Sequence, residues 1–375
     1  MPWSIKLGRI FGIDIKMHVT FLLILVWGAF AYGGSAGPLY GLLVTVSLFT
    51  LVLLHELGHS LAALGFGIGV RDITLLPIGG VARLERMPEK PLQELVIALA
   101  GPLVNVLLAV GLLPVVGGLG LLQGEGFSLR LFTQPGLLGW LMFLLSANVS
   151  LAVFNMLPAF PLDGGRVFRA IMAFFTDYRQ ATEVAANVGR ALALGLGLFA
   201  IFMGQIWLAL IALFIFMAGG QEAQAVAARS ILHQARAGQA LSAEAIALAP
   251  EATVGEAATM LMGTPRPHFV VMDPTTGQLL GVANRGQIMR AIQSGQWFYP
   301  IADIMDQARS IPVVAVSDPL DEVQDVLTRT ASPIAAVYDD LHFRGLITPD
   351  DIYRLFRLLS EQSRGSRQVR WNIIG

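Results

Sequence analysis

The sequence predicts a membrane domain built of α-helices, followed by a smaller soluble α/β domain. Hydrophobic residues make up 55% of the 375 residues and charged residues only 14%, whereas an average soluble domain carries about 25% charged residues. Long apolar runs continue to about residue 220, and beyond that point charge and polarity rise to ordinary globular levels. A pattern of short strands and helices recurs after about residue 240. A single soluble domain is therefore excluded.

Five apolar runs precede residue 220. A helix needs roughly 20 apolar residues to cross a hydrocarbon core of about 30 Å. The first run is short, and the last is interrupted at Gly204 and Gln205, where we expect a tight turn between two helices. These runs together predict about six transmembrane helices. They are residues 19–32, 39–64, 95–122, 136–160 and 191–217.

The charges between the runs predict the orientation of the chain. Lys and Arg residues gather before the first run, between the second and third, and between the fourth and fifth, whereas the opposite loops hold only Arg130. By the positive-inside rule, the N-terminus and the C-terminal third are cytoplasmic, which requires an even number of spans. Because a second apolar run follows the first closely, we expect an uncleaved, anchored N-terminus of a multi-pass cell-membrane protein rather than a signal peptide.

Composition also excludes several function classes. The formal net charge is −1, so the chain offers no basic surface for nucleic acid. The sequence contains 0 Cys residues, which excludes a disulfide framework, Cys-ligated zinc, iron–sulfur clusters and thiol catalysis.

The second apolar run carries three ionisable residues in the order His-Glu-x-x-His. Ionisable side chains at membrane depth are costly and indicate function. On a helix, His55 and His59 lie four residues apart, so they share one face and can grip one ion, for which zinc is the natural candidate. Glu56 is turned about 100° away from this face. It can reach a water held by the ion, which is the position of a general base.

A catalytic zinc needs a third protein ligand and one open position. Asp163 is the convincing candidate, because it follows the end of the fourth run, where Pro158 and Pro161 break the helix. Irregular backbone at that depth is tolerated when it is buried in protein or lines a wet cavity. We expect Gly164 and Gly165 to let the chain turn back sharply. The alternative is a simple helix exit with an aspartate near the water interface.

These motifs in combination resemble the site-2 protease family of intramembrane zinc metalloproteases. One match is the His-Glu-x-x-His sequence, and a second is Asn-x-x-Pro-x-x-Pro-Leu-Asp-Gly-Gly, which runs from Asn155 through Asp163. A third is the Gly-Pro…Asn signature formed by Gly101, Pro102 and Asn105. The similarity covers about residues 10–220.

The resemblance implies the roles of the site residues and the class of substrate. His55, His59 and Asp163 would bind one zinc ion per chain, Glu56 would be the catalytic acid and base, and Asn155 would help to hold the oxyanion or the substrate. The substrates would be membrane proteins of the anti-sigma-factor, pro-sigma-factor or remnant-signal-peptide type, cut within the lipid.

Residues 73–84 predict two short strands around a Gly-Gly turn. In the family that the motifs resemble, this stretch is a re-entrant hairpin that dips into the membrane beside the active site. An exposed hairpin edge can pair with an unwound substrate strand through main-chain hydrogen bonds. Gly79, Gly80 and Val81 are therefore expected to bind substrate. The alternative is an interfacial loop that packs its apolar residues under the helices.

The sequence of the C-terminal third predicts two copies of one βαββα unit. The matched residues Gly281 and Gly345 lie 64 positions apart, which indicates an internal repeat. The repeat resembles a pair of CBS modules, which would regulate the enzyme or assemble it into a homo-oligomer. The expected divisions are a protease domain at 1–220, a linker helix at 221–240, CBS modules at 241–296 and 297–360, and a tail at 361–375.

The second copy matches the ribose-contacting signature of CBS modules. Thr348 and Asp351 supply a hydroxyl and a carboxylate, which could hydrogen-bond the ribose of an adenosyl nucleotide. The same residues also fit a helix N-cap followed by Pro349 at the first helical position. The first copy has Asn284 and Gln287 at the equivalent places, so we expect at most one nucleotide site.

Two other function classes fit parts of the sequence. A transporter or channel regulated by CBS modules could use intramembrane His and Glu residues to relay ions. A catalytically inactive scaffold is disfavoured because the residues of the expected zinc site are all present.

Overall fold

The computed structural model describes residues 3–86, 88, 90–122, 136–241, 246–263 and 268–374, and of residues 362–374 it describes only the backbone. The chain divides into two compact units, Met1–Gln224 and Ala225–Gly375. We describe each unit by itself. Arg130, which entered the orientation argument, lies outside the described residues.

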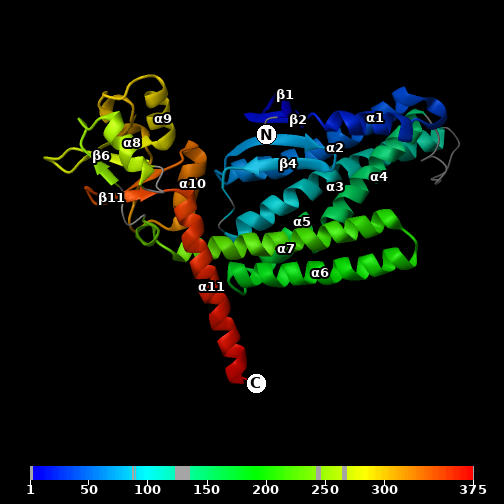
Figure 1. The fold of residues 1–375 in the computed structure, drawn as a ribbon. Helices are drawn as coiled ribbons and strands as arrows, with labels where there is room; N and C mark the ends of the chain where they lie inside the picture. The colour runs from blue at the N-terminus through cyan, green and yellow to red at the C-terminus, as the bar shows by residue number, and fades with distance from the viewer. Residues whose placement is uncertain are drawn as a thin grey trace. The chain divides into compact units, whose positions relative to one another are not determined.

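The first unit is mainly helical (Figure 1). Five helices of the described chain are long and apolar enough to cross a membrane. They are α2 (Pro38–Gly65), α3 (Pro91–Leu122), α4 (Leu137–Asn155), α6 (Tyr178–Phe202) and α7 (Ile206–Gln234). The first predicted run forms α1 (Phe21–Ala31), whose 11 residues rise about 16 Å. This is half of a bilayer core, so six spans stay a prediction.

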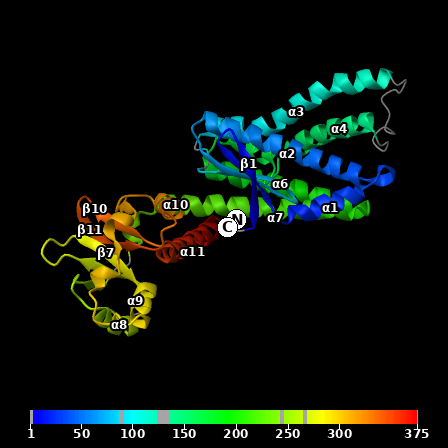
Figure 2. The same cartoon turned by 90° about the horizontal axis from the view of Figure 1, so that it is seen from above.

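The interruption of the last apolar run is confirmed. Gly204 adopts a left-handed backbone with φ of 67°, and the Gln205 N–H donates to the Ala200 carbonyl at 2.8 Å. The chain thus reverses between α6 and α7, which lie side by side in Figure 1 and Figure 2 and pack Ala193 with Ile215 in one apolar cluster. The predicted start at residue 191 was too late, because α6 begins with the polar turn at Tyr178.

The expected sharp turn at Gly164 and Gly165 is wrong. Both glycines lie inside a short helix, α5 (Asp163–Met172). They are needed for close packing instead. A Cβ atom on Gly165 would lie 2.7 Å from the Phe160 nitrogen, and one on Gly164 would strike the carbonyl oxygens of Met156 and Leu157. The segment 156–162 can therefore fold tightly against the first turn of α5.

A four-stranded sheet accompanies the helices of the first unit, in the order β1-β2-β3-β4. The strands are β1 (Ser4–Ile10), β2 (Ile13–His18), β3 (Val70–Leu76) and β4 (Gly79–Leu84). The predicted hairpin is confirmed as the antiparallel pair β3 and β4. Its turn lies at Pro77 and Ile78, however, and Gly79 and Gly80 belong to β4. Its depth in the membrane stays a prediction.

Strands β1 and β2 were not anticipated from the sequence. Strand β2 runs parallel to β3, and its Ile13 and Ile15 are buried with Leu57 of α2 and Ile97 of α3 in one apolar cluster. The sheet is drawn in blue and cyan close to α2 and α3 in Figure 1. This packing fixes the hairpin against the helix that carries the two histidines.

The second unit repeats one βαββα arrangement, as the sequence predicts. The first copy is β5 (Ile246–Leu248), α8 (Val254–Met262), β6 (His268–Met272), β7 (Leu279–Asn284) and α9 (Arg285–Gln293). The second copy is β9 (Val313–Ala315), α10 (Leu320–Thr330), β10 (Ala335–Asp339), β11 (His342–Ile347) and α11 (Pro349–Ile374). In each copy the first two strands are parallel and the last two antiparallel, and strand β8 (Asp306–Gln307) pairs with β7.

The two copies share an apolar core. Val270 and Val282 of the first copy pack in one cluster with Ala336 and Leu346 of the second. The matched glycines also occupy equivalent places, since Gly281 pairs with Val271 and Gly345 with Val337, each beside a shift in register.

Candidate metal centre

Three ligand-type atoms from two distant segments converge inside the first unit. His55 Nε2 and His59 Nε2, from successive turns of α2, lie 3.1 Å apart. Asp163 Oδ2, from the first residue of α5, lies 3.1 Å from each of them. His55 and Asp163 are buried, and the His59 side chain is only 11% exposed. Sequence positions 104 and 108 residues apart therefore meet at one point.

The other nitrogen of each imidazole is occupied by an acceptor. His59 Nδ1 lies 2.6 Å from the Ile97 carbonyl oxygen, and His55 Nδ1 lies 2.6 Å from Asn105 Oδ1. Each Nδ1 is therefore assigned as the N–H donor. In the neutral imidazoles both Nε2 atoms then carry lone pairs, which face each other and a carboxylate oxygen. A metal cation between the three atoms would accept all three lone pairs.

The spacing of these atoms fits zinc. A tetrahedral zinc ion with bonds of about 2.0–2.2 Å holds its ligand atoms about 3.3–3.6 Å apart. The observed separations of 3.1 Å are within a few tenths of an ångström of this range. Two imidazoles and one carboxylate also leave one tetrahedral position for water or substrate, as catalytic zinc sites do.

Two glycines let the helices approach closely enough to build the centre. Gly101 of α3 lies directly against the His59 ring, so a methyl group there would strike Nε2, the ligand atom itself. Gly58 of α2 allows the same close approach from the other helix, since its Cβ position is 2.8 Å from the Ala100 carbonyl oxygen of α3. The Gly-Pro…Asn signature thus supplies both the close contact and the partner of His55.

Glu56 is next to a metal-ligand residue in the sequence and contacts the hairpin in space. It follows His55 on α2 and is half-buried. A Cβ atom on Gly80 of β4 would lie 2.6 Å from Glu56 Cγ, so the backbone of this strand rests directly on the carboxylate side chain. The Glu56 carboxylate therefore lies near the ligands His55, His59 and Asp163 and in contact with the edge strand β4.

Known proteins resemble the chain over most of its length. Residues 43–196 match the sequence family described as Peptidase family M50. The zinc metalloprotease MJ0392 of Methanocaldococcus jannaschii is 31% identical over 361 residues, which cover 96% of this chain and 98% of that protein. The chain belongs to peptidase family M50.

Two further relatives match shorter parts of the chain. Stage IV sporulation protein FB of Bacillus subtilis is 28% identical over 207 residues, or 54% of this chain and 64% of that protein. A solved structure of a site-2 protease from Methanocaldococcus jannaschii has 38% sequence identity, covers 59% of this chain and 95% of that chain, and gives a TM-score of 0.44.

Membership in the M50 family decides between the function classes. The protein is a metalloprotease of the site-2 protease type, with helices suited to an integral membrane protein. The transporter or channel alternative is therefore wrong. Zinc is the metal named for the relative that matches nearly the whole chain.

Two asparagines of α4, Asn148 and Asn155, differ in what the structure shows of their contacts. Asn155 is the last residue of α4 and is half-buried, so its oxyanion role stays a prediction. Asn148 was missed by the sequence analysis, although its Oδ1 accepts from Asn105 Nδ2 at 3.0 Å and its side chain is fully buried. A polar amide inside an apolar helix was the signal that could have revealed it.

An ion cluster holds the hairpin together at its base. Asp72 of β3 is buried and accepts from Arg83 Nε of β4 at 2.7 Å and from Lys16 Nζ of β2 at 2.7 Å. The hydrogen bonds from Arg83 and from Lys16 lower the pKa of Asp72 to about 2. Three strands are thereby tied together at one end, while Gly79, Gly80 and Val81 lie at the other end, on the sheet edge.

The two expected nucleotide-binding residues form a helix cap. The Thr348 N–H donates to Asp351 Oδ2 at 3.0 Å, and the Asp351 N–H donates to Thr348 Oγ1 at 3.2 Å. The Thr348 hydroxyl also donates to Asp351 Oδ2 at 2.7 Å. Asn284 and Gln287 make the equivalent reciprocal bonds at the start of α9. The capping alternative raised from the sequence is therefore present in both copies, and nucleotide binding stays a prediction.

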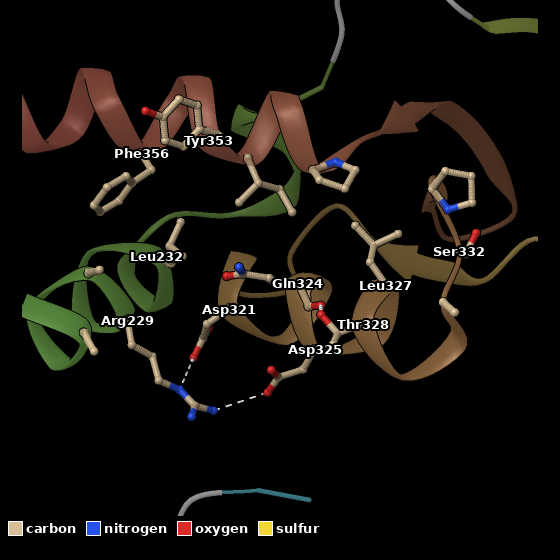
Figure 3. A pocket seen from close by; sticks show the side chains of 16 residues that line it. Arg229, Leu232, Asp321, Gln324, Asp325, Leu327, Thr328, Ser332, Tyr353 and Phe356 are labelled. Carbon is tan, nitrogen blue, oxygen red and sulfur yellow. Dashed lines mark hydrogen bonds and ion pairs between the residues drawn. The ribbon is translucent and has the colours of Figure 1, made fainter. Parts of the chain in front are cut away.

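A separate cavity of about 730 Å³ lies in the second unit. Side chains from the end of α7, from α10 and from the start of α11 line it (Figure 3). Arg229 crosses toward Asp325 at 3.3 Å and Asp321 at 3.7 Å. Neither Thr348 nor Asp351 is among the described residues that line this cavity.

Proposed function

We propose that this protein is an intramembrane zinc metalloendopeptidase that cleaves transmembrane segments of membrane-tethered proteins. The observation that carries this proposal is the convergence of His55, His59 and Asp163 beside Glu56. It occurs where helices long enough to cross a membrane meet a strand edge. These three ligands would hold the metal, one ion per chain.

When bound, zinc activates a water molecule and polarises a carbonyl group. The side chains of the chain supply the rest of the chemistry. Glu56 accepts the proton of the attacking water and later delivers it to the amine nitrogen that leaves the scissile bond. Asn155 opposes the charge that develops on the carbonyl oxygen.

The substrate must present an extended backbone at the centre. Carbonyl groups of a transmembrane helix are already hydrogen-bonded, so the helix must unwind locally before attack. Strand β4 lies at the edge of its sheet, and Gly80 contacts Glu56. Main-chain groups of Gly79, Gly80 and Val81 would pair with the unwound strand and hold it over Glu56.

The substrate class and the orientation extend this proposal. Substrates would be anti-sigma-factor, pro-sigma-factor or signal-peptide types of membrane protein, as the sequence resemblance implies. The N-terminus and the second unit would be cytoplasmic, since the positive loop charges favour that side. Lipid would surround the exposed apolar faces of the long helices.

The second unit would be a pair of CBS modules that regulates cleavage. Its repeated βαββα folds and shared core support this assignment. The proposed boundaries remain a protease domain at 1–220, a linker at 221–240, modules at 241–296 and 297–360, and a tail at 361–375. An adenosyl nucleotide at Thr348 and Asp351, and homo-oligomers formed through the modules, are parts of the same proposal. Titration calorimetry with ATP, AMP and S-adenosylmethionine tests the nucleotide, and absence of heat contradicts it.

Co-expression with candidate single-span substrates tests the enzymatic proposal. We expect cleavage by the wild-type chain and a loss of at least about 10²-fold with Glu56→Gln, while the purified variant keeps one zinc per chain. Elemental analysis of the same preparations reports the metal. A wild-type protein without stoichiometric zinc, or a Glu56→Gln variant that still cleaves, contradicts the proposal.

A further inference from the structure

Arg169 of α5 is a fully charged side chain in a nearly inaccessible place. It is only 2% exposed. Its Nε donates to Glu94 Oε1 at 2.9 Å, with Nη2 on the same oxygen, and its Nη1 donates to Glu222 Oε1 at 2.7 Å. The rings of Phe160 and Tyr178 each lie 4.9 Å from the guanidinium carbon. Burying such a charge is costly unless its partners are held in good geometry.

The bond to Glu94 connects α5, which carries the ligand Asp163, to α3, which supports the ligand His59 of α2. Glu94 lies on α3, one turn before Ile97, whose carbonyl fixes His59. Arg169 lies on α5, which begins with the third ligand, Asp163. The distance between the ligands of α2 and α5 therefore depends on how firmly Arg169 holds α3 and α5 together.

Arg169 is the residue of α5 to which the Glu94 carboxylate is hydrogen-bonded. Its Oε2 atom is buried and accepts no hydrogen bond from the described residues, while its Oε1 is taken up by Arg169. The guanidinium is a planar fork that serves two carboxylates at once. A lysine at position 169 would keep the charge but would lose this forked geometry.

The second carboxylate, Glu222, belongs to α7. This helix continues without interruption through Ala225, where the second unit begins, to Gln234. In the second unit, Arg229 of the same helix pairs with Asp325 at 3.3 Å (Figure 3). Residues 222 and 229 are seven apart, or about two turns, and so lie on one side of the helix.

We propose that Arg169 is a positioning residue for the metal centre and that Glu222 makes the centre responsive to the position of α7. The inference rests on the proposed function, because it assumes that His55, His59 and Asp163 hold zinc. Arg169 fixes α5 against α3, and Glu222 shares its guanidinium. A displacement of α7 then shifts Arg169 and, through α5, the carboxylate of Asp163.

Zinc release from the full-length protein tests the inference without relying on activity. Wild type, Arg169→Lys and Glu222→Gln are loaded with zinc and mixed with excess chelator, and the release half-time is measured. Substitution of residues that support metal ligands typically weakens metal binding by about 10–100-fold, so we expect Arg169→Lys to release zinc about tenfold faster. For Glu222→Gln we expect about threefold faster release, since Glu222 is partly exposed and its ion pair is partly screened.

Two controls separate positioning from general loss of stability. Glu183→Gln removes an exposed carboxylate that pairs with Arg179 on α6 and should leave zinc release unchanged. Met142→Ala opens a cavity in the α3–α4 core and should lower the thermal midpoint without faster release at permissive temperature. On a cleaved substrate, Glu222→Gln should lower kcat while KM stays within about twofold, because substrate pairing on β4 is untouched.

The outcomes distinguish this inference from the proposed function. Wild-type protein that holds zinc, with Glu222→Gln releasing it at the wild-type rate, overturns the role of Glu222. A folded Arg169→Lys variant that releases zinc at the wild-type rate overturns the role of Arg169. If Arg169→Lys does not fold, the zinc-release rate of Glu222→Gln alone tests the inference. Wild-type protein that binds no zinc means instead that the proposed function has failed.

Discussion

At the scale of single residues, the metal centre depends on the atoms behind the ligands. The imidazole of His59 is fixed by the Ile97 carbonyl and by Gly101, and that of His55 by Asn105. Each contact turns an Nε2 atom toward Asp163. The geometry of the centre therefore depends on these supporting contacts as well as on the three ligands.

Gly101→Ala is expected to abolish zinc binding. The new methyl group would occupy the place of His59 Nε2, so the ring must leave its position or the helices must separate. The zinc-to-protein ratio of purified protein measures the effect. Gly111→Ala is the matched control on the same helix, because open space surrounds its Cβ position. Stoichiometric zinc in Gly101→Ala would show that the ring can move without losing the metal.

Asn105→Ala is expected to lower zinc affinity by about 10–100-fold. The substitution removes the acceptor of His55 Nδ1, so the ring can rotate or change tautomer. Competition with a chelator of known affinity measures the change. Asn105→Asp keeps an acceptor oxygen and should bind zinc more tightly than the alanine variant. Equal affinities for the two variants would rule out the hydrogen bond as the cause.

At the scale of elements, the sequence predicts some features of the site much better than others. The spacing of His55 and His59 requires only helical periodicity, and it was sufficient to place them on one face. Asp163 was identified from chemistry, by the need for a third ligand. Helix α5 was not anticipated, because Gly164 and Gly165 usually indicate a turn, and only the nearby carbonyl oxygens of Met156 and Leu157 reveal their packing role. Tertiary contacts of this kind have no local sequence signal.

The same limit applies to the sheet. The hairpin of β3 and β4 was predicted from its own residues, whereas β2 was not, since its parallel pairing with β3 joins segments more than 50 residues apart. Long-range pairing also explains why Lys16 and Arg83 were counted only as loop charges. In the structure both bind Asp72.

Asp72→Asn is expected to destabilise the sheet at neutral pH by about 1–2 kcal/mol. The folded pKa of Asp72 is about 2, below the ordinary value of about 3.9. Its stabilising contribution is thus complete above about pH 4 and is lost as the pH falls toward 2. Thermal unfolding in detergent between pH 7 and pH 3 measures this. The difference in thermal midpoint between wild type and Asp72→Asn should become smaller as the pH falls from 7 to 3.

Asp339→Asn is the control for the sheet prediction. Asp339 pairs with Arg344 at 2.7 Å, but both side chains are about half exposed. An exposed ion pair contributes about 0–1 kcal/mol, so this variant should differ little from wild type at any pH. If the difference in thermal midpoint between wild type and Asp72→Asn stays constant down to pH 3, the ion pairs assigned to Asp72 with Lys16 and Arg83 are contradicted.

At the scale of the whole molecule, the chain joins two units with different cores. The first is organised around the metal centre and the long apolar helices. The second has its own core, in which the two βαββα copies meet at Val270, Val282, Ala336 and Leu346. Separate cores imply that the units can lose their structure in separate steps.

Leu346→Ala tests this independence. Leu346 is 4% exposed in the shared core, and truncation of a buried leucine costs about 2–5 kcal/mol. Differential scanning calorimetry of the full-length protein should show two transitions. The substitution should lower the midpoint of the transition of the second unit and leave that of the first unit unchanged. The midpoint of the first unit should rise on addition of zinc, since ligand binding stabilises the unit that holds the ligand.

The zinc content and a second variant serve as controls. Because the metal centre lies wholly in the first unit, the zinc content of Leu346→Ala at low temperature should equal that of wild type. Leu358→Ala, at a half-exposed position on α11, should leave both midpoints in place. A single transition that moves as a whole in Leu346→Ala would mean that the two cores unfold together.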